Sequence, residues 1–84
     1  MQQMTANDII TKLTPIFQEV LDDEVLQINM QTTAQDVDGW DSLAHIRLVV
    51  SIEKLFSLRF SAQEVSGLEN VGQMAQLILN KLAN

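Results

Sequence analysis

A stripe of apolar residues near the start of the chain recurs at steps of four, three and four: Ile9, Leu13, Ile16 and Val20. This spacing predicts one face of an α-helix. Thr5, with Asp8 three residues later, forms a variant of the capping box and marks the beginning of the helix. The acidic residues that follow Leu21 disfavour a helix C-terminus, so the helix is expected to end there. Pro15 either kinks this helix or, with Thr14 as a cap, begins a second one.

A second helix is predicted from Asp41 or Ser42 to Phe56, and it has two apolar faces. The broad face is expected in the core and comprises Leu48, Val49, Ile52, Leu55 and Phe56. The second stripe is one that the core does not need, and it comprises Leu43, Ile46 and Val50. Arg47 and Lys54 flank this stripe, while Ala44 and Ser51 are expected on the solvent side.

The rest of the chain predicts two more helices and a long loop. Ser61 with Glu64 caps a short helix that runs to about Ser66, and Asn70 opens a last helix that reaches Leu82. Residues 22–40 keep no helical period and are expected to form one long loop, and loops of this length are often functional. The fold class is therefore all-α, an antiparallel bundle of three main helices and one short helix.

The composition narrows the classes of binding partner and the cellular location to be expected. The chain has 84 residues and a net charge of −6, which fits one domain over residues 1–84 and disfavours nucleic acid and anionic membranes as partners. No apolar run approaches the length of a membrane span. The first residues, MQQMTAND, lack the features of a signal peptide, so the cytoplasm is the expected location. A monomer is the default expectation.

The sequence has few of the residues that catalysis or metal binding would require. The chain has no cysteine and one histidine, His45, which excludes disulfides, thiolate metal sites and histidine-rich metal sites. His45 follows Ser42 by three residues with no third group to orient it, so it is expected to be a half-exposed helix residue that stacks near Trp40. The three aspartates before the second helix lack the glycine and distal glutamate of an EF-hand and suit the helix dipole instead: Asp36, Asp38 and Asp41.

Ser42 is the remaining candidate for chemistry. A serine before an apolar helical run is most often only an N-cap. This hydroxyl, however, lies at a helix N-terminus, after a long loop and beside an unexplained apolar stripe. A phosphodiester on it would lie in the field of the helix N-terminus, which favours anions.

The stretch Gly39-Trp40-Asp41-Ser42-Leu43-Ala44-His45-Ile46 opens the second helix of this acidic chain and resembles the acyl carrier proteins. The resemblance extends over essentially the whole chain and implies a four-helix bundle with one minor helix. It further implies that a phosphopantetheinyl transferase esterifies Ser42 with 4′-phosphopantetheine, with Asp41 and Leu43 helping the transferase to dock. The chain would then be a carrier of acyl thioesters and not an enzyme.

The same resemblance implies a surface for acyl-loading and acyl-processing enzymes, formed by Leu43, Ile46, Arg47, Val50, Glu53 and Lys54. Three residues are candidates to line a space for the acyl chain: Ile46, Ile52 and Phe56.

Departures from the family pattern bear on the pathway. Carriers of bacterial fatty acid synthesis display several acidic residues along the second helix, which meet basic patches on their enzymes. Here Arg47 and Lys54 occupy such positions, Ala44 is neutral, and Glu53 alone remains of the acidic series. The pattern favours a freestanding carrier of polyketide or other secondary-metabolite synthesis, and Arg47 suggests a partner with an acidic patch. The alternatives are a carrier of aminoacyl or D-alanyl groups, and an unmodified helical adaptor in which Ser42 is only a cap.

Overall fold

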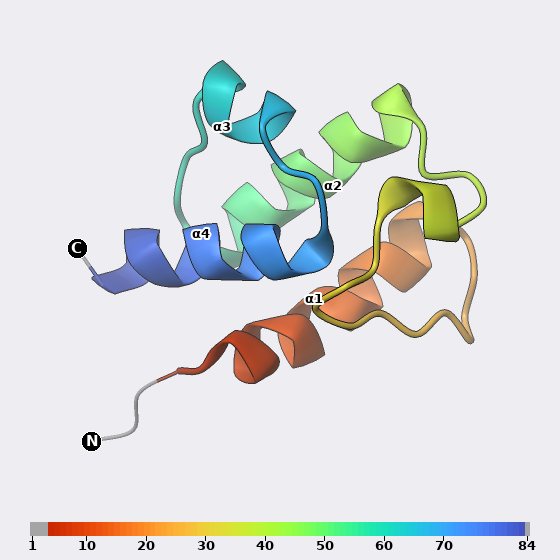
Figure 1. The fold of residues 1–84 in the computed structure, drawn as a ribbon, viewed down its shortest axis with the longest axis horizontal. Helices are drawn as coiled ribbons and strands as arrows, with labels where there is room; N and C mark the ends of the chain where they lie inside the picture. Colours follow the sequence, from red (N-terminus) through yellow and green to blue (C-terminus); the bar gives the residue numbers. More distant parts are fainter. Residues whose placement is uncertain (1–3, 84) are drawn as a thin grey trace.

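The computed structural model describes residues 4–83, and these form an all-helical bundle (Figure 1). The elements in chain order are α1 (Ala6–Val20), the 3-10 turn η1 (Ala34–Asp36), α2 (Ser42–Phe56), the short α3 (Ala62–Ser66) and α4 (Val71–Ala83). Helix α1 packs against both α2 and α4. The predicted fold class of three main helices and one short helix is confirmed. Within residues 4–83, no helix has the length and apolar character needed to cross a bilayer.

The core lies where the three main helices meet. Its largest fully buried side chains are Ile9, Leu13 and Phe17 from α1, Leu48 and Ile52 from α2, and Val71, Met74 and Ile78 from α4. Burying one such side chain contributes about 1.5–3 kcal/mol. The helical stripes predicted from spacing therefore become the faces that hold the bundle together.

Short-range capping sets the beginnings of α1 and α3. Asp8 N donates to Thr5 Oγ1 at 3.2 Å, and Thr5 N donates to Asp8 Oδ2 at 2.9 Å. Ser61 and Glu64 repeat this reciprocal pair at the start of α3. Both predicted capping boxes are confirmed.

Pro15 lies inside one continuous helix. The Thr14 hydroxyl donates to the carbonyl of Ile10 at 2.9 Å, a bond within the helix, so Thr14 does not cap a new segment. Of the two readings of Pro15, a split of the first helix is excluded.

The two sides of α2 differ from the prediction at two positions. Ala44 is buried with 7% of its surface exposed, because it lies four residues before Leu48 and shares its side of the helix. Leu55 points in nearly the same direction but is 52% exposed, since the described neighbours leave the last turn of α2 open there. The prediction of Ala44 on the solvent side and of Leu55 in the core was wrong.

The long loop between α1 and α2 is fastened to the beginning of α4. Val71 N donates to Thr32 O at 2.8 Å, and Gly72 N donates to Met30 O at 2.9 Å. A side chain at residue 72 would not fit, because a Cβ built on Gly72 would lie 2.6 Å from the Met30 carbonyl oxygen. The loop thus satisfies N–H groups that the first turn of a helix leaves without partners.

Candidate functional site

Two adjacent residues at the beginning of α2 have different roles: one caps the helix, and the other exposes its hydroxyl. Asp41 is the N-cap, and its Oδ1 accepts a hydrogen bond from Ala44 N at 2.9 Å. Ser42 is the first residue of α2 and is exposed, and its hydroxyl forms no hydrogen bond with residues 4–83. Gly39 adopts a φ of +86° in the turn that leads to this point, a conformation that favours glycine. The interpretation of Ser42 as merely a cap is therefore wrong in this structure.

Trp40 and His45 brace the approach to α2. Their rings stack with centroids 6.0 Å apart, and Trp40 Nε1 donates to His45 Nδ1 at 3.2 Å, which confirms the expected association. Trp40 also forms a T-shaped pair with Phe17 of α1, with ring centroids 5.1 Å apart. Because an indole N–H can only donate, Nδ1 is the acceptor and Nε2 carries the ring hydrogen.

The other ring nitrogen of His45 reaches α3. Nε2 lies 3.2 Å from the carbonyl oxygen of Val65 and donates to it in this tautomer. Both ring nitrogens are thus engaged in joining α2 to its neighbours. His45 is a structural residue here and does not serve as a base for Ser42.

A cavity of about 500 Å³ opens beside Ser42, between the beginning of α2, α3 and the beginning of α4. Its lining consists of Ala34, Trp40, Asp41, Ser42, His45, Ile46, Val65, Ser66, Leu68, Glu69, Asn70 and Met74. Ile46 lines it as expected for a residue near an acyl chain. Ile52 and Phe56 do not line it, because Ile52 is fully buried in the core and Phe56 packs against that core.

Residues of α3 and α4 in this lining were missed by sequence reasoning. Val65 and Met74 reach the cavity only because α3 and α4 turn back toward α2. No local pattern carries that information, since the approach depends on tertiary packing.

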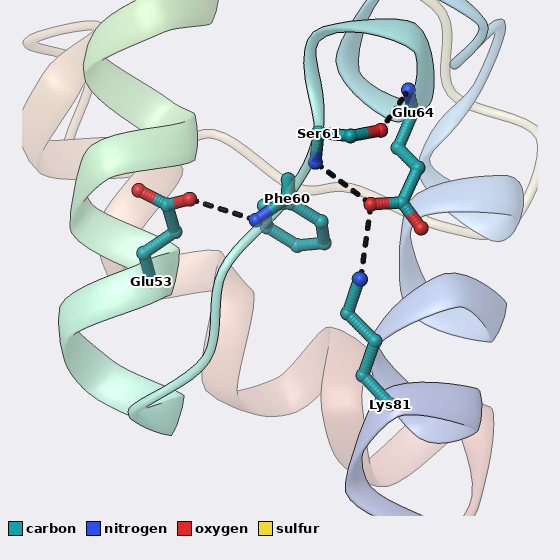
Figure 2. A network of polar contacts seen from close by, with 5 residues as sticks. All are labelled: Glu53, Phe60, Ser61, Glu64 and Lys81. Carbon is teal, nitrogen blue, oxygen red and sulfur yellow. Dashed lines mark hydrogen bonds and ion pairs between the residues drawn. The ribbon is translucent and has the colours of Figure 1, made fainter.

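A polar network holds α3 beside the cavity (Figure 2). Glu64 Oε1 accepts hydrogen bonds from Ser61 N at 2.8 Å and from Lys81 Nζ of α4 at 2.9 Å. These two contacts lower the pKa of Glu64 below its ordinary value, with the Ser61 N–H the larger cause and Lys81 the next. The network ties one wall of the cavity to α4.

The second apolar stripe of α2 is exposed, as expected. The exposed fractions are 60% for Leu43, 58% for Ile46 and 42% for Val50, and Arg47 and Lys54 are exposed beside them. Glu53 differs: it is half-buried, and its Oε2 accepts a hydrogen bond from Phe60 N at 2.8 Å (Figure 2).

Metal ligands do not gather in the part of the chain that the structure describes: no group of three or more histidine, cysteine, aspartate or glutamate side chains there could hold an ion. Asp36 instead accepts hydrogen bonds from the backbone and hydroxyl of Thr33. The site is therefore built around Ser42 and the adjacent cavity.

Residues 11–78 match the family described as "Phosphopantetheine attachment site". The chain is also similar to the holo acyl carrier protein from Geobacter metallireducens, known from a solution NMR structure. The two share 43% sequence identity and a TM-score of 0.82 over 88% of this chain and 85% of that one. The chain therefore belongs to the phosphopantetheine attachment family, whose members carry their cofactor covalently. Within it, the chain is an acyl carrier protein: it carries 4′-phosphopantetheine and is a carrier, not a catalyst.

Carrier proteins of this family interact with phosphopantetheinyl transferases and with acyl-processing enzymes. These interactions require an accessible attachment residue and an accessible docking face.

Proposed function

We propose that Ser42 carries the phosphopantetheine arm and that the chain shuttles acyl groups as a freestanding carrier. The observation that supports this most directly is the Ser42 hydroxyl, which is exposed and makes no hydrogen bond with residues 4–83. The arm supplies the thiol that this cysteine-free chain lacks, and acyl groups are held on that thiol as thioesters.

The residues around Ser42 fit such a group. The backbone N–H groups of the first turn of α2 favour the negative charge of a phosphodiester at residue 42. Asp41 holds that turn in place through Ala44 N and, with Leu43, lies where a transferase must dock. The cavity beside Ser42 has room for part of an acyl chain, with Ile46, Leu68 and Met74 among its apolar walls.

The enzymes that load and process the acyl group dock, in this proposal, on the exposed side of α2. The surface comprises Leu43, Ile46, Arg47, Val50, Glu53 and Lys54. Its three apolar members are large and are exposed to solvent. Large exposed apolar side chains in a row are typical of interaction surfaces.

The pathway in this proposal is a specialised one, polyketide or other secondary-metabolite synthesis. Arg47 and Lys54 stand where carriers of bacterial fatty acid synthesis display acids, and both are exposed to a partner. A charge mismatch of this kind chiefly weakens encounter and discrimination between enzymes.

The unit that performs this task is a single domain over residues 1–84, acting as a monomer. Its proposed place of work is the cytoplasm, where reducing conditions keep thiols in the reduced form that can accept an acyl group.

Intact-mass measurement tests the attachment. The protein is incubated with coenzyme A and a broad-specificity phosphopantetheinyl transferase, in parallel with Ser42→Ala. We expect the wild type alone to gain the mass of one phosphopantetheine. A folded wild type that gains nothing from an active transferase, or a Ser42→Ala variant that gains the same mass, contradicts the assignment and favours the adaptor or another attachment residue.

A further inference from the structure

Three of the five basic residues of this acidic chain gather along α2 and the loop that follows it: Arg47, Lys54 and Arg59. We propose that this cationic surface docks the acidic surface of a partner enzyme. The inference rests on the proposed carrier function and adds to it the charge of the partner and a third basic residue.

Helix geometry places two of these cations on one line. Arg47 and Lys54 are seven residues apart, which is close to two turns and about 10 Å along the axis. Leu43 and Val50 lie on the same line, at steps of four, three and four with the two cations. All four side chains are exposed. The line therefore alternates apolar and cationic contacts.

Arg59 extends this line past the end of α2. Ser57 ends the helix in the left-handed conformation, with a φ of 54°, and redirects the chain. A hollow of about 420 Å³ lies at the turn and is lined by Val50, Glu53, Lys54, Ser57, Leu58 and Arg59. Lys54 and Arg59 thus border a recess whose walls also include the apolar side chains of Val50 and Leu58.

The single acid of α2, Glu53, forms no ion pair with these cations within residues 4–83. Glu53 is half-buried, and one of its carboxylate oxygens accepts the Phe60 N–H, so this acid fastens the loop that carries Arg59 (Figure 2). Within residues 4–83, the one ion pair joins Lys81 to Glu64, on the α3–α4 side. Within the described residues, Arg47, Lys54 and Arg59 are therefore not engaged in ion pairs and can pair with acidic groups of a partner.

The segregation of charge identifies the sign of that partner. The chain as a whole has a net charge of −6, yet Glu53 is the one acid within α2. Glu19 of α1 borders a hollow together with Arg47 and Val50, but within residues 4–83 it forms no ion pair with Arg47. A generally cationic partner would be attracted to the rest of the molecule but repelled at the docking line. Only an acidic patch is complementary to the line itself, and such complementarity acts mainly on encounter rate and on the choice of partner.

A charge swap tests the inference. The probe is a malonyl transacylase of bacterial fatty acid synthesis, used in its natural form with a basic docking surface and in a form whose docking lysines and arginines are changed to glutamate. The carrier is used as wild type and as the triple variant Arg47→Glu, Lys54→Glu, Arg59→Glu. Loading of the holo forms is measured as kcat/KM, and binding of the unmodified forms is followed by NMR shifts of α2.

We expect the basic transacylase to load the triple variant about tenfold better than the wild type at low salt, and the acidic transacylase to show the reverse order. High salt should remove both differences, because exposed charges are screened. The single variants Arg47→Glu, Lys54→Glu and Arg59→Glu are each compared with Lys12→Glu on α1, an exposed lysine outside the surface. This matched control for one reversed charge should change kcat/KM by less than about twofold.

Loading and binding that do not depend on the three charges, or that change equally in Lys12→Glu, overturn the inference even when Ser42 accepts the arm. Failure of Ser42 to accept the arm overturns the proposed function, and the binding measurement on unmodified protein still decides the charge question.

Discussion

Asp41 and Ser42 are neighbours with separate tasks. Asp41 satisfies a backbone N–H at the beginning of α2, whereas the Ser42 hydroxyl is exposed and makes no hydrogen bond with residues 4–83. The sequence alone does not decide which of the two is the N-cap of α2, because aspartate and serine are both good N-caps. Only the backbone at the end of the loop decides which of them becomes the cap.

This division predicts that substitutions at the two residues change the free energy of unfolding by different amounts. Asp41→Ala should lower the free energy of unfolding by about 1 kcal/mol, since the cap is lost. Ser42→Ala should change it by less than about 0.5 kcal/mol, as for other surface substitutions. Urea denaturation followed by circular dichroism measures both. A loss of stability in Ser42→Ala as large as that in Asp41→Ala would show that the hydroxyl has a structural role.

Single residues also show where sequence reasoning succeeds and fails. The stacking of His45 with Trp40 could be predicted, because the two residues are close in sequence on either side of a helix start. The contact of His45 with Val65 could not, since it joins residues twenty positions apart. Leu55 was misplaced because a helical wheel gives direction around the axis but not whether a neighbour covers that turn.

Among the elements, α3 depends most on specific polar contacts. It is five residues long, which is too short to be stable alone, and its described residues are all half-buried or exposed. Its capping box fixes its own first turn, and the Lys81–Glu64 pair joins it to α4. The ionised carboxylate of Glu64 therefore contributes, together with the contact between His45 and Val65, to the position of α3 and of one wall of the cavity.

The lowered pKa of Glu64 predicts a pH-dependent contribution to stability. A carboxyl group whose pKa is lower in the folded state stabilises the fold fully above its ordinary value of 4.5, and this contribution is lost as the pH falls through the lowered pKa. Wild type should therefore exceed Glu64→Gln in melting temperature near neutral pH, and the gap should close in acid.

Thermal unfolding across this pH range measures the gap. Glu24→Gln, at an exposed loop position, is the control and should show a small difference throughout. A gap for Glu64→Gln that stays constant down to strongly acidic pH would mean that the charge does not hold α3.

The elements themselves could largely be predicted from the sequence. Capping pairs and helical stripes are short-range signals, so the bounds of α1, α2 and α3 agree with the predicted ones to about a residue. The long loop was predicted only as a loop. Its 3-10 turn and its bonds to α4 went unpredicted, because main-chain hydrogen bonds between distant segments leave no mark in side-chain pattern.

At the scale of the whole molecule, the loop joins distant parts of the chain. Met30 and Thr32 accept hydrogen bonds from the first two residues of α4, about forty positions later in sequence. The loop then continues through η1 to Trp40 and the beginning of α2. The surroundings of Ser42 therefore depend on the docking of the last helix.

Substitution of Gly72 tests this connection. Gly72→Ala places a Cβ against the Met30 carbonyl oxygen and should destabilise the protein by about 1–3 kcal/mol, as overpacking does. Helix propensity alone would predict a gain of about 1 kcal/mol. Chemical denaturation measures the sign, and Gln76→Ala on the exposed side of α4 should change little. A stabilised Gly72→Ala variant would refute the close approach.

The bonds between the loop and α4 also concern the order in which the parts of the chain fold. The loop that precedes Ser42 gains its two hydrogen bonds to α4 only when Val71 and Gly72 have docked against it. We therefore expect a chain truncated before residue 71 to present Ser42 at the end of a loop without this anchor. Recognition of the serine by a modifying enzyme would then depend on the docking of α4, so that folding of the last helix acts as a checkpoint for modification.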